Sequence, residues 1–289
     1  MTPLVHIGYH KTGSTWLQRQ IFRDDMGFDV VLSQAQVDAL IVAPHRLNFD
    51  PNMAQSAASA ARDGRVPVVS SENLSGHPFF GGRDSFCFAE RVQQIWPNAR
   101  ILIVTRAQTT VLPSVYMQYL KRGGVLPPKA FFAGSGGVNY PGFDPMHFAY
   151  DRLIAQYQSL FSNVTVLTYE SLERDPAAFA ADLLTTAGAP ENALPSDRIG
   201  KTSPSPSTGS IGLLRAVNRV RRSVLNPCPL LPISTAGGRL DKVVYAIAAR
   251  LPESTVLTSY VREELALLYR ESNARLAQLR PELDLSAYP

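Results

Sequence analysis

Cysteine is scarce in this chain of 289 residues, and long apolar runs are absent. Cys87 and Cys228 are the only cysteines, which excludes a disulfide-stapled scaffold and predicts two reduced thiols. No stretch approaches the roughly 18 apolar residues of a membrane-spanning helix, since the nearest candidate, residues 243–251, is too short. The apolar start of the chain meets His10 and Lys11 too early for a secretory signal. We therefore expect a cytoplasmic protein.

The composition excludes intrinsic disorder, because 45% of the residues are apolar and only 18% are charged. The length allows one or two domains. No internal repeat and no linker divides the sequence. We therefore expect a single domain over residues 1–289.

The excess of positive charge is small and local. Lys and Arg number 28 against 24 Asp and Glu, a net charge of +4. Residues 211–223 account for it, because they hold no acidic residue and four arginines: Arg215, Arg219, Arg221 and Arg222. An excess confined to one helix favours an anionic small molecule over nucleic acid. A solvated helix face, or peripheral membrane contact through Ile211–Ser223, is the alternative.

Short apolar runs alternate with helix-length segments along the first two thirds of the chain. Unbroken runs of this kind are typical of strands that are buried on both faces of a parallel sheet. The expected strands cover residues 4–8, 66–70, 101–105 and 164–168, and the expected helices cover 85–96, 110–121, 147–161 and 176–187. Further helices are expected at 211–223, 240–251 and 256–279. This pattern predicts a three-layer α/β fold with a central parallel sheet and a helical C-terminal part.

Two glycine- and proline-rich stretches separate these elements. Residues 123–145 carry four aromatic side chains and suit a loop that either walls a pocket or packs against the core. These aromatic residues are Phe131, Phe132, Tyr140 and Phe143. Residues 195–210 are rich in Ser, Thr and Pro, which predicts mobility in the free protein.

The turn after the first expected strand is the most informative segment. The strand runs into a turn that contains Gly13, and a helix opens at Ser14 and Thr15. Such a turn directs backbone N–H groups and the positive end of a helix at one point, which makes an anion site. Lys11 adds a positive charge. A plain turn with a capping serine is the alternative.

This turn does not match the P-loop (Walker A) motif that binds nucleoside triphosphates. Its lysine precedes Gly13 instead of following the second glycine of the motif. The strand ends carry Glu72, Arg106 and Glu170 but no Asp that would hold Mg²⁺. A phosphate compound bound without a metal is therefore favoured, and a P-loop-type nucleotide or sugar kinase is the alternative.

The run His10-Lys11-Thr12-Gly13-Ser14-Thr15-Trp16 resembles the 5′-phosphosulfate loop of the sulfotransferases that use 3′-phosphoadenosine 5′-phosphosulfate (PAPS). The usual form of that loop is Pro-Lys-Ser-Gly-Thr-Thr-Trp, so this chain departs from it at His10, Thr12 and Ser14. The resemblance implies that residues 10–16 bind the phosphosulfate. It also implies a P-loop-kinase-like fold, with PAPS as donor, adenosine 3′,5′-bisphosphate (PAP) as product and no metal.

Two later segments strengthen the resemblance, which spans residues 4 to about 188. Arg106 at a strand end and Ser114 eight positions later match the pair that binds the 3′-phosphate in this family. Tyr169 matches the family's tyrosine near the adenine, with packing at a strand end as the alternative. The family's Arg-Lys-Gly clamp is missing, and Lys201 would stand in its place.

Sulfuryl transfer needs a base at the acceptor hydroxyl and positive charge at the leaving oxygen. Lys11 suits the second role. Glu72 follows a strand at the crevice edge of the sheet, where carbohydrate sulfotransferases often have a glutamate base, which favours a sugar or glycolipid acceptor. His77 is the alternative base, and His10 suits contact with the phosphosulfate. A non-catalytic binding protein is a further alternative.

Overall fold

The computed structural model describes residues 2–58, 60–134, 141–189, 206–230 and 239–289, without the side chains of 239–242. Its centre is a five-stranded sheet in which every pairing is parallel, in the order β2-β3-β1-β4-β5. The strands are β1 (Leu4–His6), β2 (Phe28–Leu32), β3 (Val66–Ser70), β4 (Arg100–Thr105) and β5 (Val164–Thr168). The four expected strands are confirmed, although β1 ends at His6 instead of residue 8.

Strand β2 was not predicted from the sequence. It lies at the edge of the sheet and pairs only with β3. Asp29 breaks its apolar run, and Val30 is 49% exposed. An edge strand needs no unbroken apolar run, because one of its sides is not covered by a neighbouring strand.

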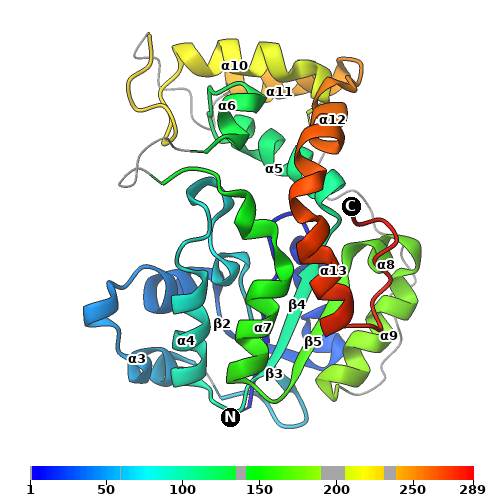
Figure 1. The fold of residues 1–289 in the computed structure, drawn as a ribbon. Helices are drawn as coiled ribbons and strands as arrows, with labels where there is room; N and C mark the ends of the chain where they lie inside the picture. Colours follow the sequence, from blue (N-terminus) through cyan, green and yellow to red (C-terminus); the bar gives the residue numbers. More distant parts are fainter. Residues whose placement is uncertain (1, 59, 135–140, 190–205, 231–238) are drawn as a thin grey trace.

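Helices cover both faces of the sheet (Figure 1). Successive residues of a strand point to opposite faces, so Val5 belongs to one apolar cluster and Leu4 to the other. The larger cluster holds residues of the helices at Ser85–Ile95, Gln108–Lys121, Tyr150–Leu160 and Arg270–Leu279, and the smaller one holds residues of the helices at Ser14–Trp16 and Pro176–Ala187. The three-layer α/β architecture is therefore confirmed.

Four helices begin and end close to the predicted positions: α4 (Ser85–Ile95), α5 (Gln108–Lys121), α7 (Tyr150–Leu160) and α9 (Pro176–Ala187). The helix α1 (Ser14–Trp16) begins where expected, whereas four short helices were not predicted: α2 (Gln34–Val37), α3 (Pro51–Ala57), α6 (Pro128–Phe132) and α8 (Tyr169–Arg174). The expected helix at 147–161 begins later, because Pro145–Phe148 forms a separate 3₁₀ turn.

The C-terminal part is helical as expected. It contains α10 (Ile211–Val220), α11 (Arg239–Arg250), α12 (Val256–Tyr260) and α13 (Arg270–Leu279). The single helix expected at 256–279 is wrong in detail, because a π-helical turn at Val261–Leu265 and a 3₁₀ turn at Ala266–Tyr269 separate α12 from α13. Within the described residues, no helix has the length and apolar character needed to cross a bilayer.

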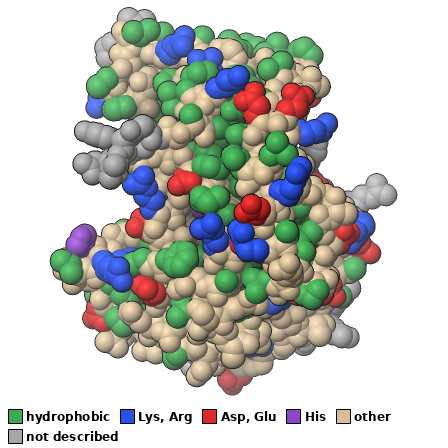
Figure 2. Space-filling view, in the orientation of Figure 1, with side chains coloured by type: hydrophobic (Ala, Val, Ile, Leu, Met, Phe, Trp, Pro, Cys, Tyr) green, Lys and Arg blue, Asp and Glu red, His purple; other side chains and the backbone are tan. Residues whose placement is uncertain are grey.

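The arginines of the 211–223 segment do not share one face. Arg215 donates from Nε to the carbonyl of Val125 at 3.1 Å, and Arg221 is buried. Arg219 and Arg222 are exposed. Figure 2 shows basic and apolar side chains together at the top of the molecule, over α10 and α11. Peripheral membrane contact through this segment stays a prediction.

The aromatic residues of the 123–145 stretch pack against the core. Phe131, Phe132 and Phe143 are buried, and the Phe131 and Phe143 ring centroids lie 5.1 Å apart. Tyr140 lies outside the described residues, as do residues 195–205. These three phenylalanines therefore pack against the core, as one of the two alternatives for this stretch predicted. Cys87 and Cys228 are both free thiols.

Candidate active site

The loop between β1 and α1 has the backbone of an anion-binding turn. Lys11 has a φ of 70° and Gly13 a φ of 90°. Lys11 is the only non-glycine residue with positive φ in the described part of the chain, and such a conformation costs about 1–3 kcal/mol. No side chain caps α1, so the N–H groups of Ser14 and Thr15 have no partner within the helix. Strain and unpaired donors at one turn indicate a ligand site for an anion.

Gly8 allows the loop to pass close to the sheet. A Cβ at Gly8 would lie 2.6 Å from both His6 Nε2 and Ser14 Oγ. The Nδ1 atom of His6 shares a hydrogen bond of 2.8 Å with Ser70 Oγ. Burial lowers the pKa of His6 from 6.5 to about 3, so its ring is neutral near pH 7. His6 Nε2 and Ser14 Oγ are both buried without a hydrogen-bond partner in the described structure.

Two of the predicted loop residues turn their side chains into the protein. Thr12 donates from Oγ1 to the carbonyl of Tyr9 at 2.6 Å, and Trp16 packs against the Phe179 ring with centroids 6.3 Å apart. Thr15 is exposed and Lys11 is half-buried. Thr12 and Trp16 therefore hold the loop in place, whereas Thr15 is open to solvent.

Arg106 ties the end of β4 to the loop. Its Nη1 donates to the carbonyl of Lys11 at 2.9 Å, and its Nε donates to Thr110 Oγ1 at 3.1 Å. The guanidinium carbon lies 4.3 Å from the centroid of the Tyr169 ring. Ser114 donates to the carbonyl of the same Thr110 at 3.0 Å. The three residues predicted to bind the donor nucleotide therefore gather around one point.

Gly13 lies against the same aromatic ring. A Cβ at Gly13 would be 3.3 Å from Tyr169 Cδ2 and 2.8 Å from Leu172 Cδ2. Burial raises the pKa of Tyr169, and the charge of Arg106 partly offsets that rise. A bare glycine is needed here for both its φ and its close approach.

Several residues that the sequence did not indicate form hydrogen bonds with Arg106 or with its neighbours in the chain. Tyr150 donates from Oη to the Arg106 carbonyl at 2.7 Å, and the N–H of Ala107 donates to Glu170 Oε1 at 2.9 Å. The hydroxyl of Tyr288 lies 2.8 Å from Thr105 Oγ1 and donates to Glu170 Oε2 at 3.3 Å. No local pattern could have placed Tyr288, because it lies 183 positions from Thr105.

Glu72 opens a 3₁₀ turn (Glu72–Ser75) directly after β3. Its Oε2 lies 4.0 Å from His10 Nε2, and its side chain is 31% exposed. Burial raises the pKa of the carboxyl, while the nearby Ser14 hydroxyl and the charge of Lys11 lower it. Burial lowers the pKa of Lys11, and the charge of Glu72 opposes that shift. A carboxylate, an ammonium group and the anion-binding turn therefore meet at one edge of the sheet.

His10 and His77 lie beside Glu72, with ring centroids 5.0 Å apart. Burial is the main cause that lowers the pKa of both rings, so both are neutral near pH 7. His77 Nδ1 accepts from the backbone N–H of Phe79 at 3.2 Å. Neutral His77 then carries its proton on Nε2 and offers the site a donor instead of a free lone pair.

A cleft of about 760 Å³ opens beside Glu72. Arg106, Ser114 and Tyr169 are not among the residues that line this cleft. Its lining residues are His10, Thr15, Gln18, Gln34, Asp38, Glu72, Asn73, His77, Phe79, Phe80, Gln118, Lys121, Arg122, Ser223, Val224 and Leu225. Among these, Gln118, Lys121 and Arg122 were not predicted, although their spacing from Ser114 follows the helical repeat.

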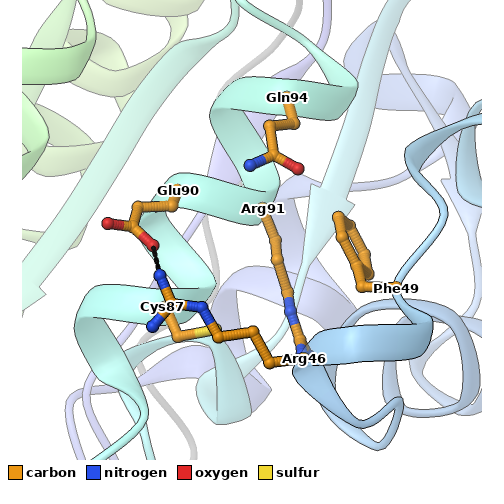
Figure 3. Close-up of a pocket in the computed structure, with 6 residues that line it drawn as sticks. All are labelled: Arg46, Phe49, Cys87, Glu90, Arg91 and Gln94. Atoms are coloured by element: carbon orange, nitrogen blue, oxygen red, sulfur yellow. Dashed lines mark hydrogen bonds and ion pairs between the residues drawn. The ribbon is translucent and has the colours of Figure 1, made fainter.

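A smaller hollow of about 140 Å³ lies between α4 and residues 46–49 (Figure 3). It shares no lining residue with the cleft. The Arg91 guanidinium fills much of its wall, because it stacks 4.7 Å from the Phe49 ring centroid and donates to the Pro44 carbonyl at 2.7 Å. An exposed ion pair between Arg46 and Glu90 closes one side. We assign this hollow to packing.

The structure thus brings together most of the predicted site residues. His10, Lys11, Gly13, Ser14, Thr15, Glu72, His77, Arg106, Ser114 and Tyr169 surround the carboxyl ends of the central strands. Lys201 lies outside the described residues. In the described part of the chain, no group of three or more His, Cys, Asp or Glu side chains is arranged to hold a metal.

No protein-family model matches the sequence, and no curated protein matches it. Among solved structures, the chain is similar to a sulfotransferase from Alicyclobacillus acidocaldarius, with 18% identity over 99% of this chain and 98% of that chain and a TM-score of 0.63. That likeness shows the fold and confirms the expected architecture. Two further matches have lower scores. A sulfotransferase domain from the curacin biosynthetic pathway has 14% identity over 92% and 98% of the two chains and a TM-score of 0.41. Mouse sulfotransferase SULT7A1 complexed with PAP has 11% identity over 97% and 85% and a TM-score of 0.40.

Proposed function

We propose that the protein is a sulfotransferase that moves a sulfuryl group from PAPS to a hydroxyl acceptor. The observation that carries this proposal is the bond from Arg106 to the Lys11 carbonyl. It joins the strained phosphosulfate-type loop to the arginine of the 3′-phosphate pair, two motifs that lie 95 positions apart in the sequence. Both motifs resemble those that bind PAPS in this family, and the hydrogen bond between them supports a single binding site for that donor.

The residues present fit this donor. The free N–H groups of Ser14 and Thr15, with Lys11, would bind the 5′-phosphosulfate. Arg106 uses Nε and Nη1 within the protein, and Nη2 has no partner among the described residues, so it is available to the 3′-phosphate. Ser114 would turn its proton from the Thr110 carbonyl to the same phosphate. Tyr169, which is half-buried and lies beside Arg106, would contact the adenine.

The reaction that follows is an in-line displacement at sulfur. The acceptor oxygen forms the new S–O bond, and the bond between sulfur and the 5′-phosphate oxygen breaks. The electron pair stays on the phosphate oxygen of PAP, where the Lys11 ammonium stabilises it. The acceptor proton passes to Glu72. Burial raises the pKa of Glu72, which makes it a stronger base than an exposed carboxylate.

Glu72 is proposed as the base in preference to His77. The lone pair on His77 Nδ1 is used by the Phe79 N–H, whereas Glu72 has a side chain that lines the cleft. His77 then serves as a hydrogen-bond donor in the cleft. His10 lies between the two and would contact the sulfonate.

A sugar or the headgroup of a glycolipid is proposed as the acceptor. Side-chain amides and carboxylates are the usual partners of sugar hydroxyls, and the cleft presents Gln34, Asp38 and Asn73 along one side. Phe80, which is 47% exposed, adds an apolar surface against which a sugar ring can pack.

Thermal melting with different nucleotides tests the donor. PAP should raise the melting temperature, because a ligand that binds only the folded state stabilises it. Stabilisation by ATP with Mg²⁺ and none by PAP would replace this proposal with a kinase. Transfer of ³⁵S from labelled PAPS into lipid and polysaccharide extracts then tests the reaction, and a protein that binds PAP but labels nothing would be a binding protein.

A further inference from the structure

One face of α5 connects the donor side of the site to the cleft. Thr110, Ser114, Gln118 and Lys121 follow each other at intervals of four, four and three residues, so they lie in a row on the same side of the helix. Thr110 holds Arg106, while Gln118 and Lys121 line the cleft. The rise from Ser114 to Lys121 is about 10 Å, which is the size of a sugar ring with its substituents.

Two residues that line the cleft each carry a buried polar atom without a hydrogen-bond partner in the described part of the chain. Gln118 Oε1 and His10 Nδ1 have no hydrogen-bond partner among the described residues, and His10 is only 3% exposed. Both residues line the cleft. A buried polar atom without a partner is costly and commonly marks a place where a ligand or a water completes the bonding. A carbonyl oxygen such as Gln118 Oε1 accepts a hydrogen bond from a hydroxyl group.

Two cations at the end of α5 lack partners as well. Lys121 and Arg122 are exposed, and neither side chain has an ion pair or a hydrogen bond within the part of the chain that the structure describes. Both line the cleft. Arg122 is close enough to the reacting groups to contribute to the lowered pKa of His10, Lys11 and His77.

Among the described residues, neither carboxylate of the cleft forms an ion pair with these cations. Asp38 Oδ1 accepts from Asn73 Nδ2 at 2.7 Å and from Gln34 Nε2 at 3.1 Å. Glu72 faces His10. The positive charge of Lys121 and Arg122 is therefore available to a ligand in the cleft.

We propose that Gln118, Lys121 and Arg122 form an acceptor subsite that selects a hydroxyl compound carrying an anionic group. This inference rests on the proposed sulfotransferase function and adds the charge of the acceptor to it. A hydroxyl group of the acceptor donates to Gln118 Oε1, and its carboxylate, phosphate or sulfate group lies against Lys121 and Arg122. The hydroxyl that reacts then reaches Glu72, and the apolar face of the acceptor packs on Phe80.

Matched pairs of acceptors test the subsite. The full chain, saturated with PAP, is titrated with methyl glucuronide against methyl glucoside and with glucose 6-phosphate against glucose, by calorimetry or saturation-transfer NMR. The anionic member of at least one pair should bind roughly tenfold more tightly. The pair that shows the larger preference distinguishes a carboxylate from a phosphate. Raising the salt concentration should reduce the preference.

A charge-removing double variant assigns the preference to these residues. Lys121→Gln with Arg122→Gln should abolish it and leave PAP affinity within about twofold. The matched control is Lys129→Gln with Arg219→Gln, which removes the same charge from two exposed residues outside the cleft. It should keep the preference. Gln118→Leu should weaken both members of a pair equally, because it removes an acceptor for a hydroxyl and no charge.

Three results would overturn the inference while leaving the proposed function intact. They are equal binding of both members of each pair, a preference that survives in the double variant, and a loss of PAP affinity of roughly tenfold in that variant. The last would assign Lys121 and Arg122 to the donor. Failure of the wild-type chain to bind PAP would instead overturn the proposed function, and with it this inference.

Discussion

Arg106 donates from Nη1 to the backbone carbonyl of Lys11 at 2.9 Å. This bond uses one edge of the guanidinium to hold the loop, while the face of the same group covers the Tyr169 ring. The residue expected to bind the donor's 3′-phosphate therefore also fixes the position of the loop expected to bind its 5′-phosphosulfate. The two ends of the proposed donor site therefore depend on one side chain.

Replacing Arg106 should therefore affect donor binding more than the loss of one charge would. Arg106→Lys keeps the charge but cannot reach the Lys11 carbonyl and a phosphate at once, because it has no planar fork. We expect PAP to bind roughly 10- to 100-fold more weakly, measured by calorimetry. Arg46→Lys, at an exposed arginine outside the site, is the control. Wild-type affinity in Arg106→Lys would contradict the dual role.

Glu72→Gln should lower kcat by about 10²- to 10⁴-fold, the usual contribution of a general base, with little change in PAP affinity. In the wild-type chain the rate should rise as pH increases through the pKa of Glu72, because only the carboxylate accepts the proton. Burial raises that pKa, so this limb lies above the range of an exposed glutamate. The variant should lack the limb.

Two controls accompany that measurement. Glu263→Gln, at an exposed carboxylate, should leave the rate unchanged. His77→Asn should lower it less than Glu72→Gln does. The reverse order would transfer the role of base to His77.

The stability of the protein should fall in mild acid because of its buried histidines. Burial lowers the pKa of His6 and of His147 from 6.5 to about 3. Both rings stay neutral in the folded chain at pH 5, whereas the unfolded chain binds protons there. The stabilisation is therefore complete above pH 6.5 and decreases as pH falls towards 3. At pH 5 each histidine should cost about 2 kcal/mol.

Urea unfolding at pH 7 and pH 5 measures this loss. His147→Gln should unfold with a smaller difference between the two pH values, since one of the titrating groups is removed. An unchanged difference in the variant would show that His147 does not contribute. His45→Gln, at an exposed histidine, is the control and should behave as the wild-type chain does.

The hydroxyl of Tyr288 should matter to the donor site although it lies near the end of the chain. It contacts Thr105 and Glu170, and Glu170 in turn accepts from the N–H of Ala107, next to Arg106. Tyr288→Phe should lower the free energy of unfolding by about 1 kcal/mol and weaken PAP binding about threefold. In Tyr260→Phe the lost hydroxyl has no hydrogen-bond partner among the described residues, so neither quantity should change. Equal PAP affinity in both variants would limit Tyr288 to a structural role.

The sequence predicted those parts of the fold that follow from burial. β3 and β4 are short apolar runs because neighbouring strands and helices cover them. β5 lies at the edge opposite β2 and was recognised because its sequence, Val-Thr-Val-Leu-Thr, contains no charged residue. β2 was missed because an edge strand tolerates Asp29, which accepts from Arg62 on the solvent side. The break between α12 and α13 was also missed, because the apolar spacing of this stretch continues through the π-helical turn.

In the site, too, the sequence revealed local patterns and missed contacts between distant residues. The anion-binding turn and the Arg106–Ser114 pair are local patterns, so the sequence revealed them. Tyr288 was invisible because its contacts join residues far apart in the chain. Lys121 and Arg122 were not singled out, since basic residues at the end of a helix usually interact with its dipole. Only the cleft shows that they line the same cavity as Glu72 and His77.

Gly13 offers the sharpest test of the loop, because the chain provides a matched control in Gly64. Both glycines have positive φ, 90° and 74°. A Cβ at Gly64 would meet nothing within 4 Å, whereas one at Gly13 would press on Leu172 and Tyr169. Gly64→Ala should cost only the backbone strain, about 1–2 kcal/mol, and should keep PAP affinity. Gly13→Ala should cost more in urea unfolding and weaken PAP binding roughly tenfold or more, because the loop must move away from Tyr169 and Arg106. If both alanine variants bind PAP as the wild-type chain does, the contact between this loop and Tyr169 does not shape the donor site.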